Sequence, residues 1–297
     1  MYCLKDGKVE PLDKITIGFR AFDPHELLIY FLAVNLGHYK QNGLTPELKD
    51  VALTTDDDEL YHSVEYLVAC GSALMGALKG IHWKIVFVAT ENPMFWVYGN
   101  QEISSLQELR GKKIAGYPLN TPPGRFLRII LRKNGIDPDR DLTIESVHDD
   151  LSRLGLLRSG QADHAVLSSA MPPPKIQKLG LKMNLFFGEH LKIPSAGLAV
   201  REELVQENPD QVRGVIRAHN LALNAVSEFP TRAMRVIANL SNNPSDLASE
   251  TYDLVFPLLT TDGKSSEKVN SEAIRLLSQE LSLNPRKSND IYDFSLL

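Results

Sequence analysis

Polar residues in short loops that follow apolar runs could bind a small molecule. Such loops commonly meet the N-termini of helices, where oxygen-rich or anionic ligands bind. Helix capping needs the same residue types, so capping alone also explains Ser72, Thr121 and Ser168. The candidate ligand-binding residues are Arg20, Phe22, Asp23, Gly71, Ser72, Glu91, Trp96, Tyr117, Asn120, Thr121, Ser168 and Ser169.

Arginine side chains near these loops could clamp an anion. Arg20 directly follows an apolar run, and its guanidinium could form charge-assisted hydrogen bonds. Arg125, Arg128 and Arg132 instead share one helical stripe, opposite Phe126. A solvated polar face explains that stripe without a ligand, and we favour this interpretation.

Aromatic residues could form the walls of a pocket. Met94, Trp96 and Tyr98 alternate, so they share one face of a predicted strand. Core packing is the common fate of such residues, and we predict it for Tyr98. Trp96 and Tyr117 are predicted to line the pocket. His25, at a predicted helix start, is interpreted as a surface residue.

Three acidic residues belong to the same set of loops. Asp23 and Glu26 fit a capping box at the start of a helix, which explains both without a ligand. Glu91 has no such local explanation. A carboxylate beside a ligand suits an amine or a ring N–H, which favours a heteroaromatic or amine-bearing ligand over nitrate.

The sequence offers little for catalysis. It has no paired carboxylates, metal-binding triad, phosphate-cradling glycine loop or nucleophile elbow. Cys70 is interpreted as a small buried packing residue. We therefore predict a protein that is not an enzyme and that needs no cofactor and no metal.

The elements that must position these residues are clearest in residues 105–141. A short helix is followed by an apolar strand at 112–116, a polar loop, and a helix from Pro122 to about Lys133. A loop that joins the carboxyl end of a strand to a helix is where α/β sheets bind ligands. Residues 66–73 and 164–170 repeat a strand followed by a small polar loop, which indicates two lobes of similar plan.

Further strands are predicted at residues 14–19, 47–53, 64–69, 84–89, 94–98, 142–147, 162–168, 182–187 and 195–200. From Arg201 the chain is predicted to be nearly all helical, with helices that start at Pro209, Pro230, Pro244 and about Glu267. The strand at 182–187 is expected to return toward the first lobe. Glu91, Asn92 and Pro93 are expected to form a crossing point between the lobes.

Two motifs resemble a known family. Residues 105–115 (SLQELRGKKIA) and 133–143 (KNGIDPDRDLT), with Ala33, Gly37, Tyr39, Gly43 and Leu44, are similar to the solute-binding proteins of ABC importers for nitrate, sulfonates and taurine. That family includes binding proteins and hydroxymethylpyrimidine synthase-like enzymes for the pyrimidine half of thiamine. The histidine- and cysteine-rich motif of those synthases is absent from this sequence.

The resemblance implies a bilobal α/β fold of the periplasmic-binding-protein type II class, with a crossover hinge and a helical C-terminal tail on the first lobe. Lobe I would comprise residues 1–92 and 190–297, and lobe II residues 93–189. A small polar, anionic or heteroaromatic ligand would bind between them, and an ABC permease would be the protein partner. The alternative is a cytoplasmic enzyme on the same scaffold, such as a pyrimidine or menaquinone-pathway synthase or lyase.

Composition limits the remaining possibilities. The 297 residues, 43% of them hydrophobic and 23% charged, suit a globular protein of two lobes. A net charge of -5 gives no reason to expect nucleic acid as a partner, and we expect a monomer. Two cysteines are too few for a disulfide framework, and Cys3 is interpreted as a surface thiol rather than a former lipid anchor.

Localisation depends on whether a leader once preceded the chain. Residues 1–14 lack the apolar segment of a signal peptide. If a signal peptide has been removed, we expect a periplasmic or extracellular, membrane-associated protein. If the chain is complete as written, we expect a cytoplasmic one.

Overall fold

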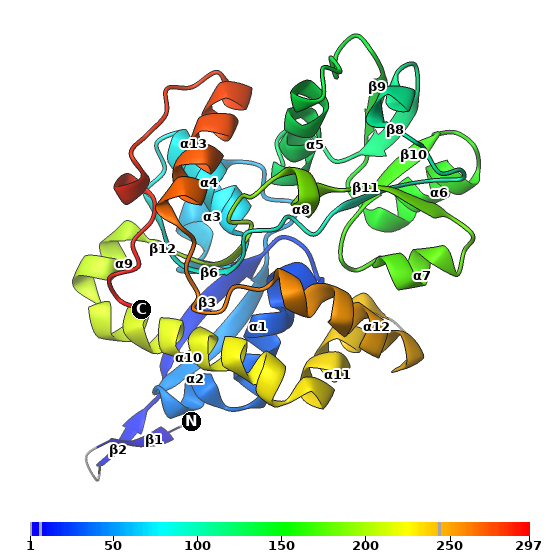
Figure 1. The fold of residues 1–297 in the computed structure, drawn as a ribbon. Coiled ribbons are helices and arrows are strands. Elements are labelled where there is room, and N and C mark those ends of the chain that lie inside the picture. The colour runs from blue at the N-terminus through cyan, green and yellow to red at the C-terminus, as the bar shows by residue number, and fades with distance from the viewer. Residues whose placement is uncertain (1, 6–7, 243–244) are drawn as a thin grey trace.

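The computed structural model describes residues 2–5, 8–242 and 245–297, and the side chains of residues 12–242 and 247–297. In this part the chain forms two lobes, each built around a five-stranded sheet (Figure 1). A two-stranded antiparallel hairpin, β1 (Tyr2–Lys5) and β2 (Lys8–Pro11), projects from the first lobe and was not predicted. Pro244 and the side chain of Cys3 lie outside the described residues.

Lobe I contains a sheet of order β4-β3-β5-β12-β6. β3 runs parallel to β4 and β5, whereas β12 is antiparallel to β5 and β6. The predicted strand at 47–53 lies instead at 44–50, and Pro46 is tolerated there because β4 is an edge strand. The strands are β3 (Asp13–Phe19), β4 (Leu44–Asp50), β5 (Tyr66–Leu67), β6 (Trp83–Thr90) and β12 (Ala196–Arg201), and the helices between them are α1 (Pro24–Asn35), α2 (His38–Gln41), α3 (Asp57–Ser63) and α4 (Cys70–Leu78).

Lobe II contains a sheet of order β11-β7-β10-β8-β9, in which β8 is parallel to β9 and β10. The strand predicted at 182–187, β11, pairs with β7 at the edge of this sheet, and the chain returns toward lobe I directly after it. The strands are β7 (Trp96–Gly99), β8 (Lys113–Gly116), β9 (Thr143–Ser146), β10 (His164–Leu167) and β11 (Lys182–Phe186), and the helices are η1 (Leu106–Leu109), α5 (Pro122–Lys133), α6 (Asp150–Arg158), α7 (Pro173–Gln177) and α8 (Phe187–His190).

The chain crosses between the sheets twice. It leaves the first sheet after Thr90 and enters the second at Trp96, then leaves after Phe186 and returns at Ala196. The lobe boundaries at residues 92/93 and 189/190 fall within these connecting segments and stay a prediction.

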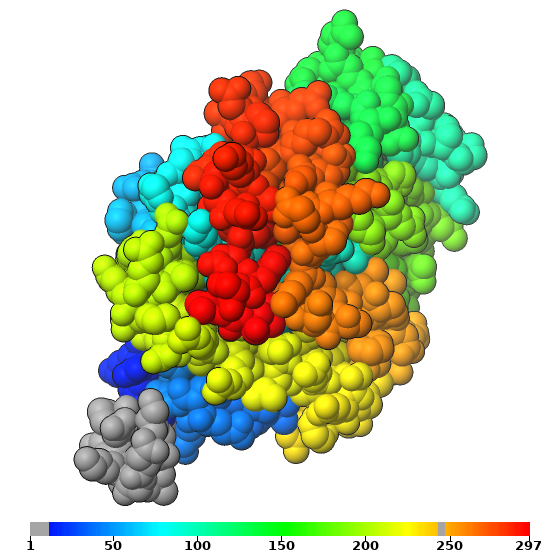
Figure 2. Space-filling model, turned by 60° about the vertical axis from the view of Figure 1, so that its left-hand side comes forward, coloured from blue at the N-terminus to red at the C-terminus, as the bar shows by residue number. Residues whose placement is uncertain are grey.

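The C-terminal third is helical, as predicted, but it contacts both lobes. α10 and α11 pack on α1 of lobe I, whereas α12 packs on α7 and α13 packs on both α4 and α5. Figure 2 shows this segment, yellow to red, running along one face and adjoining the green lobe II. The tail comprises α9 (Glu202–Glu207), α10 (Pro209–Glu228), α11 (Pro230–Ser241), α12 (Ser245–Val255), η2 (Phe256–Leu258), α13 (Glu267–Leu281) and η3 (Ser288–Asp290).

Candidate ligand-binding cleft

A cleft of about 340 Å³ lies between the lobes, a size that suits a small molecule. Lobe I contributes the loop after β3, the start of α1, the loop after β4 and the start of α4. Lobe II contributes the loops after β8, β9 and β10 and the starts of α5 and α6. The cleft therefore lies at the carboxyl ends of the parallel strands, as the sequence predicts.

Asp23 forms the floor of the cleft on the lobe I side and is 1% exposed. It is the N-cap of α1, and its Oδ1 accepts a hydrogen bond from the Glu26 amide at 3.0 Å. Its other oxygen, Oδ2, is buried and has no hydrogen-bond partner among the described residues. The predicted cap is confirmed, and it leaves one carboxylate oxygen unused.

Glu26 does not complete the predicted capping box. Its Oε2 accepts hydrogen bonds from the amides of Arg20 (2.7 Å) and Ala21 (3.1 Å) rather than from the amide of Asp23. The side chain thus fixes the loop after β3, which carries Arg20 into the cleft.

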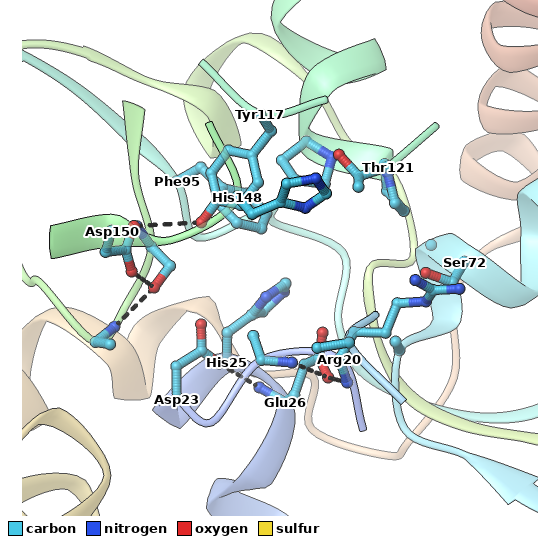
Figure 3. A pocket seen from close by; sticks show the side chains of 18 of the residues that line it. Arg20, Asp23, His25, Glu26, Ser72, Phe95, Tyr117, Thr121, His148 and Asp150 are labelled. Atoms are coloured by element: carbon cyan, nitrogen blue, oxygen red, sulfur yellow. Dashed lines mark hydrogen bonds between the residues drawn. The ribbon is translucent and has the colours of Figure 1, made fainter. Parts of the chain in front are cut away.

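Arg20 and Ser72 mark the opposite end of the cleft from Asp23 (Figure 3). Arg20 donates one hydrogen bond from Nη2 to the carbonyl of Thr54 at 2.9 Å. Within the described part of the chain, its buried Nε and the buried Ser72 Oγ have no partner. Ser72 is not the predicted cap, because α4 begins at Cys70 with Ala69 as its N-cap.

Asp150, at the start of α6, organises the lobe II side of the cleft. Its carboxylate accepts hydrogen bonds from the Ser168 amide (3.0 Å), the Ser168 hydroxyl (2.5 Å) and the Tyr117 hydroxyl (3.4 Å). Arg153 forms an ion pair with it at 2.5 Å. Asp150 is therefore fully engaged within its own lobe.

Arg153 is 1% exposed and was not anticipated from sequence. Besides Asp150, it donates to the carbonyls of Val166 (2.6 Å), Val147 (2.6 Å) and His148 (2.9 Å). Its guanidinium carbon stacks 3.5 Å from the centre of the Tyr117 ring. Because its donors are used within lobe II, Arg153 positions the cleft wall rather than binding an anion.

Aromatic rings and prolines form the apolar walls. Phe95, Tyr117 and Phe126 line the cleft with Pro122 and Pro123. A Cβ on Gly71 would lie 3.1 Å from Pro122 and 3.4 Å from Phe126, so the starts of α4 and α5 are in close contact. The walls thus offer apolar and aromatic surface to a ligand.

Helix N-termini offer few free amides here, contrary to expectation. α5 begins with two prolines, which have no N–H, and the Thr121 hydroxyl donates to the Pro118 carbonyl at 2.6 Å. In α1, the His25 amide donates to Ser169 Oγ at 2.9 Å. In α4, the Gly71 amide donates to the Ser195 carbonyl at 3.2 Å. An anion would find few backbone donors.

His25 is buried in the cleft wall, and its prediction as a surface residue is wrong. A hydrogen bond of 2.9 Å joins its Nε2 to Ser195 Oγ, and its ring contacts Phe95 edge-on. Burial lowers the pKa of His25 to about 3, so the ring is neutral at physiological pH.

The acids of the cleft favour their protonated forms. Burial raises the pKa of Asp23 well above its ordinary value, and the neighbouring Glu26 raises it further. Burial also raises the pKa of Glu26. For Glu26, burial outweighs the opposite effect of the nearby Arg20.

The structure separates the predicted ligand-binding residues into two sets. Glu91 accepts a hydrogen bond from the Ser266 amide at 3.3 Å, and Trp96 stacks on Phe186 within lobe II. Asn120 is exposed, and Ser169 is buried beneath α1. Those that line the cleft are Arg20, Phe22, Asp23, Gly71, Ser72, Tyr117, Thr121 and Ser168. Contact of these residues with a ligand stays a prediction.

Several contacts hold the lobes together around the cleft. The His25–Ser169 bond joins α1 to lobe II, and Lys175 of α7 donates to the Ser241 carbonyl of α11 at 2.6 Å. On the other side, Glu280 of α13 pairs with Arg125, Arg128 and Arg132 of α5. The predicted solvated face is therefore wrong for Arg128, which is buried.

Neither a metal site nor a membrane span is found in the described residues. They contain no group of three or more His, Cys, Asp or Glu side chains that could hold a metal ion. Among residues 2–5, 8–242 and 245–297, no helix is both long and apolar enough to cross a membrane.

Comparison with known proteins gives one family match. The family model described as "NMT1/THI5 like" matches residues 25–233, more than two-thirds of the chain. No match is found among curated protein sequences.

Solved structures with the same fold are numerous and distant in sequence. The alkanesulfonate-binding protein SsuA from Xanthomonas axonopodis, bound to MOPS, has a TM-score of 0.76 at 14% identity and covers 96% of this chain and 100% of its own. A zinc-bound ligand-binding component of an ABC-type import system from Staphylococcus aureus has a TM-score of 0.75 at 14% identity, with coverage of 96% and 97%. The CA3427 product of Candida albicans, described as having the generic periplasmic binding protein fold, has a TM-score of 0.73 at 14% identity, with coverage of 95% and 96%. The chain thus has the predicted bilobal periplasmic-binding-protein fold.

Proposed function

The chain belongs to the NMT1/THI5-like family, and on that basis we propose that it is the solute-binding protein of an ABC importer. The observation that carries the proposal is the cleft between two lobes, where buried polar atoms of Asp23, Arg20 and Ser72 lack partners among the described residues. A ligand held between the lobes would satisfy those atoms. The import system of the Staphylococcus aureus relative supports an ABC permease as partner.

We further propose that binding occurs without turnover. The cleft contains one hydrogen-bonded serine–histidine pair, Ser195 and His25. His25 is a weak base because burial lowers its pKa to about 3, and no carboxylate is hydrogen-bonded to its ring in the described structure. A solute-binding role requires neither a serine nucleophile nor a histidine base.

A screen of small solutes tests the function. Thermal unfolding would be measured with sulfonates, nitrate, aromatic acids, amines and heteroaromatic compounds. A true ligand at 100 times its dissociation constant should add about 2.7 kcal/mol to the free energy of unfolding. Mass spectrometry should then recover the ligand unchanged. A recovered product, or no stabilising compound, would contradict the proposal.

The importer role places the protein outside the cytoplasmic membrane. Fractionation of cells that express the full gene tests this location. Recovery in the cytoplasmic fraction would favour the alternative, an enzyme on the same scaffold.

A further inference from the structure

Three buried polar atoms in the cleft lack hydrogen-bond partners in the described part of the protein: Asp23 Oδ2, Arg20 Nε and Ser72 Oγ. Asp23 is 1% exposed and Ser72 is 6% exposed, so water does not readily solvate either side chain. Leaving a buried polar group unsatisfied costs about 1–3 kcal/mol. These atoms therefore indicate which ligand groups the cleft is built to receive.

The acceptor and donor groups lie at different ends of the cleft. Figure 3 shows Asp23 beneath Asp150 and Tyr117, whereas the Arg20 side chain extends toward Ser72. The first end offers an acceptor that needs a donor from the ligand. The second offers a guanidinium and a hydroxyl, which suit an acceptor on the ligand.

Acidic side chains gather at the Asp23 end of the cleft. Asp23, Glu26 and Asp150 line it, Arg153 pairs with Asp150, and Arg20 lies close enough to Glu26 to lower its pKa. The Asp150 carboxylate already accepts from Arg153, Ser168 and Tyr117, and Glu26 accepts from two backbone amides. Asp23 is left as the acid with an oxygen, Oδ2, that has no hydrogen-bond partner among the described residues, although the nearby Ser169 hydroxyl lowers the pKa of its carboxyl.

We propose, resting on the solute-binding function above, that the ligand is a flat ring compound that presents a protonated nitrogen to Asp23 and a hydrogen-bond acceptor to Arg20 and Ser72. A cationic nitrogen beside Asp23 favours the ionised form of that carboxyl, which then accepts a charge-assisted hydrogen bond from the nitrogen. The ring lies among Phe95, Tyr117 and Phe126, which supply apolar contact. A carboxylate or sulfonate at the Asp23 end brings a further acid into a cluster of acids, and it finds no free amide on the described start of α1.

Four probes with one skeleton test the proposal. 4-Amidinobenzamide carries a cationic amidine, terephthalamide a neutral amide, and 4-carbamoylbenzoate and 4-carbamoylbenzenesulfonate an anion at the same ring position. Affinities would be measured by isothermal titration calorimetry. We expect 4-amidinobenzamide to bind at least about tenfold more tightly than either anion, a ratio equivalent to 1.4 kcal/mol.

Two matched variants assign the preference to its residue. Asp23→Asn keeps a side-chain oxygen for the α1 cap but removes the charge. Asp56→Asn makes the same change at the N-cap of α3, where Asp56 accepts from the Glu59 amide on an exposed surface. The cationic probe should lose about tenfold or more in affinity for Asp23→Asn and keep its affinity for Asp56→Asn, while circular dichroism confirms that both variants fold.

Other outcomes overturn this inference. They are equal or tighter binding of an anion, an unchanged cation preference in Asp23→Asn, and no binding by any of the four probes. If the broad solute screen still yields a ligand in those cases, the solute-binding function stands and only the ligand class is wrong. If that screen also fails, both proposals fail together.

Discussion

Glu280 of α13 pairs with Arg128 of α5 at 3.4 Å, and the two side chains are only 3% and 9% exposed. The pair joins the C-terminal tail to lobe II, beside a cleft that both lobes line. Arg125 and Arg132 approach the same Glu280 carboxylate. Glu280 and Asp139 together therefore balance the charges of three guanidinium groups.

Glu280→Gln should destabilise the folded protein, because it removes the buried carboxylate that three arginines share and leaves only Asp139 beside Arg128 and Arg132. Breaking a buried ion pair from one side costs about 3–5 kcal/mol, and we expect a loss near the lower figure because Arg132 is partly exposed. Urea denaturation measures the change. Glu272→Gln is the control, since Glu272 pairs with Arg275 on the exposed face of the same helix and should cost less than about 1 kcal/mol. Equal losses in both variants would contradict this account.

Arg153→Lys should also be destabilising, although it keeps the positive charge. The planar guanidinium of Arg153 donates to the carbonyls of Val147 and Val166 and to the Asp150 carboxylate at once. The ammonium group of a lysine cannot reach all three acceptors. We expect a loss of about 2–3 kcal/mol in the free energy of unfolding. Arg158→Lys, on the exposed side of α6, should change it by less than about 0.5 kcal/mol. A neutral Arg153→Lys would show that the stacked guanidinium is dispensable.

Ser72→Ala should separate binding from stability. Its hydroxyl is buried without a partner in the described structure, so removing it should leave the unfolding free energy unchanged or raise it by up to about 1–3 kcal/mol. Affinity for the compound found in the solute screen should fall by about 1 kcal/mol, or roughly fivefold. Ser278→Ala removes a similar buried hydroxyl from α13, outside the cleft, and should leave affinity unchanged. Unchanged affinity in Ser72→Ala would remove Ser72 from the site.

Stability without ligand should depend on pH through Asp23. Burial raises the pKa of Asp23 in the folded state above its ordinary value of 3.8, so the folded protein holds this proton more tightly than the unfolded chain does. The contribution to stability is therefore complete below pH 3.8 and is lost as pH rises toward the folded-state pKa. Asp23→Asn should make the protein more stable at pH 7 and reduce the fall in stability between pH 4 and pH 7, measured by urea denaturation. Asp56→Asn should leave that pH profile as in the wild type, and a profile unchanged by Asp23→Asn would refute the assignment.

Local sequence signals predict most of the helices and strands that surround the cleft. Asp23 caps α1 as predicted, because a cap is decided by residues within one helical turn. The alternation of apolar and polar runs likewise predicts most strands, and strand ends then locate the cleft.

Contacts between distant segments could not be predicted in this way. Glu280 lies far along the chain from the arginines of α5, so their stripe resembled a solvated face. The alternation of residues 94–98 correctly places Trp96 in a strand. That pattern cannot show, however, that the ring of Phe186 stacks on the ring of Trp96. The role of Arg153 depends on carbonyls from two other loops, which no local motif specifies.

The position of β12 affects the order in which the protein can fold during synthesis. β12 lies between β5 and β6 in the first sheet, but it follows the whole of lobe II in sequence. The ribosome must therefore complete β7 to β11 before the first sheet can close. Lobe II is continuous in the chain and can fold first, whereas the facing edges of β5 and β6 stay open until β12 emerges. In that interval those edges are the part of the nascent protein most exposed to pairing with other chains.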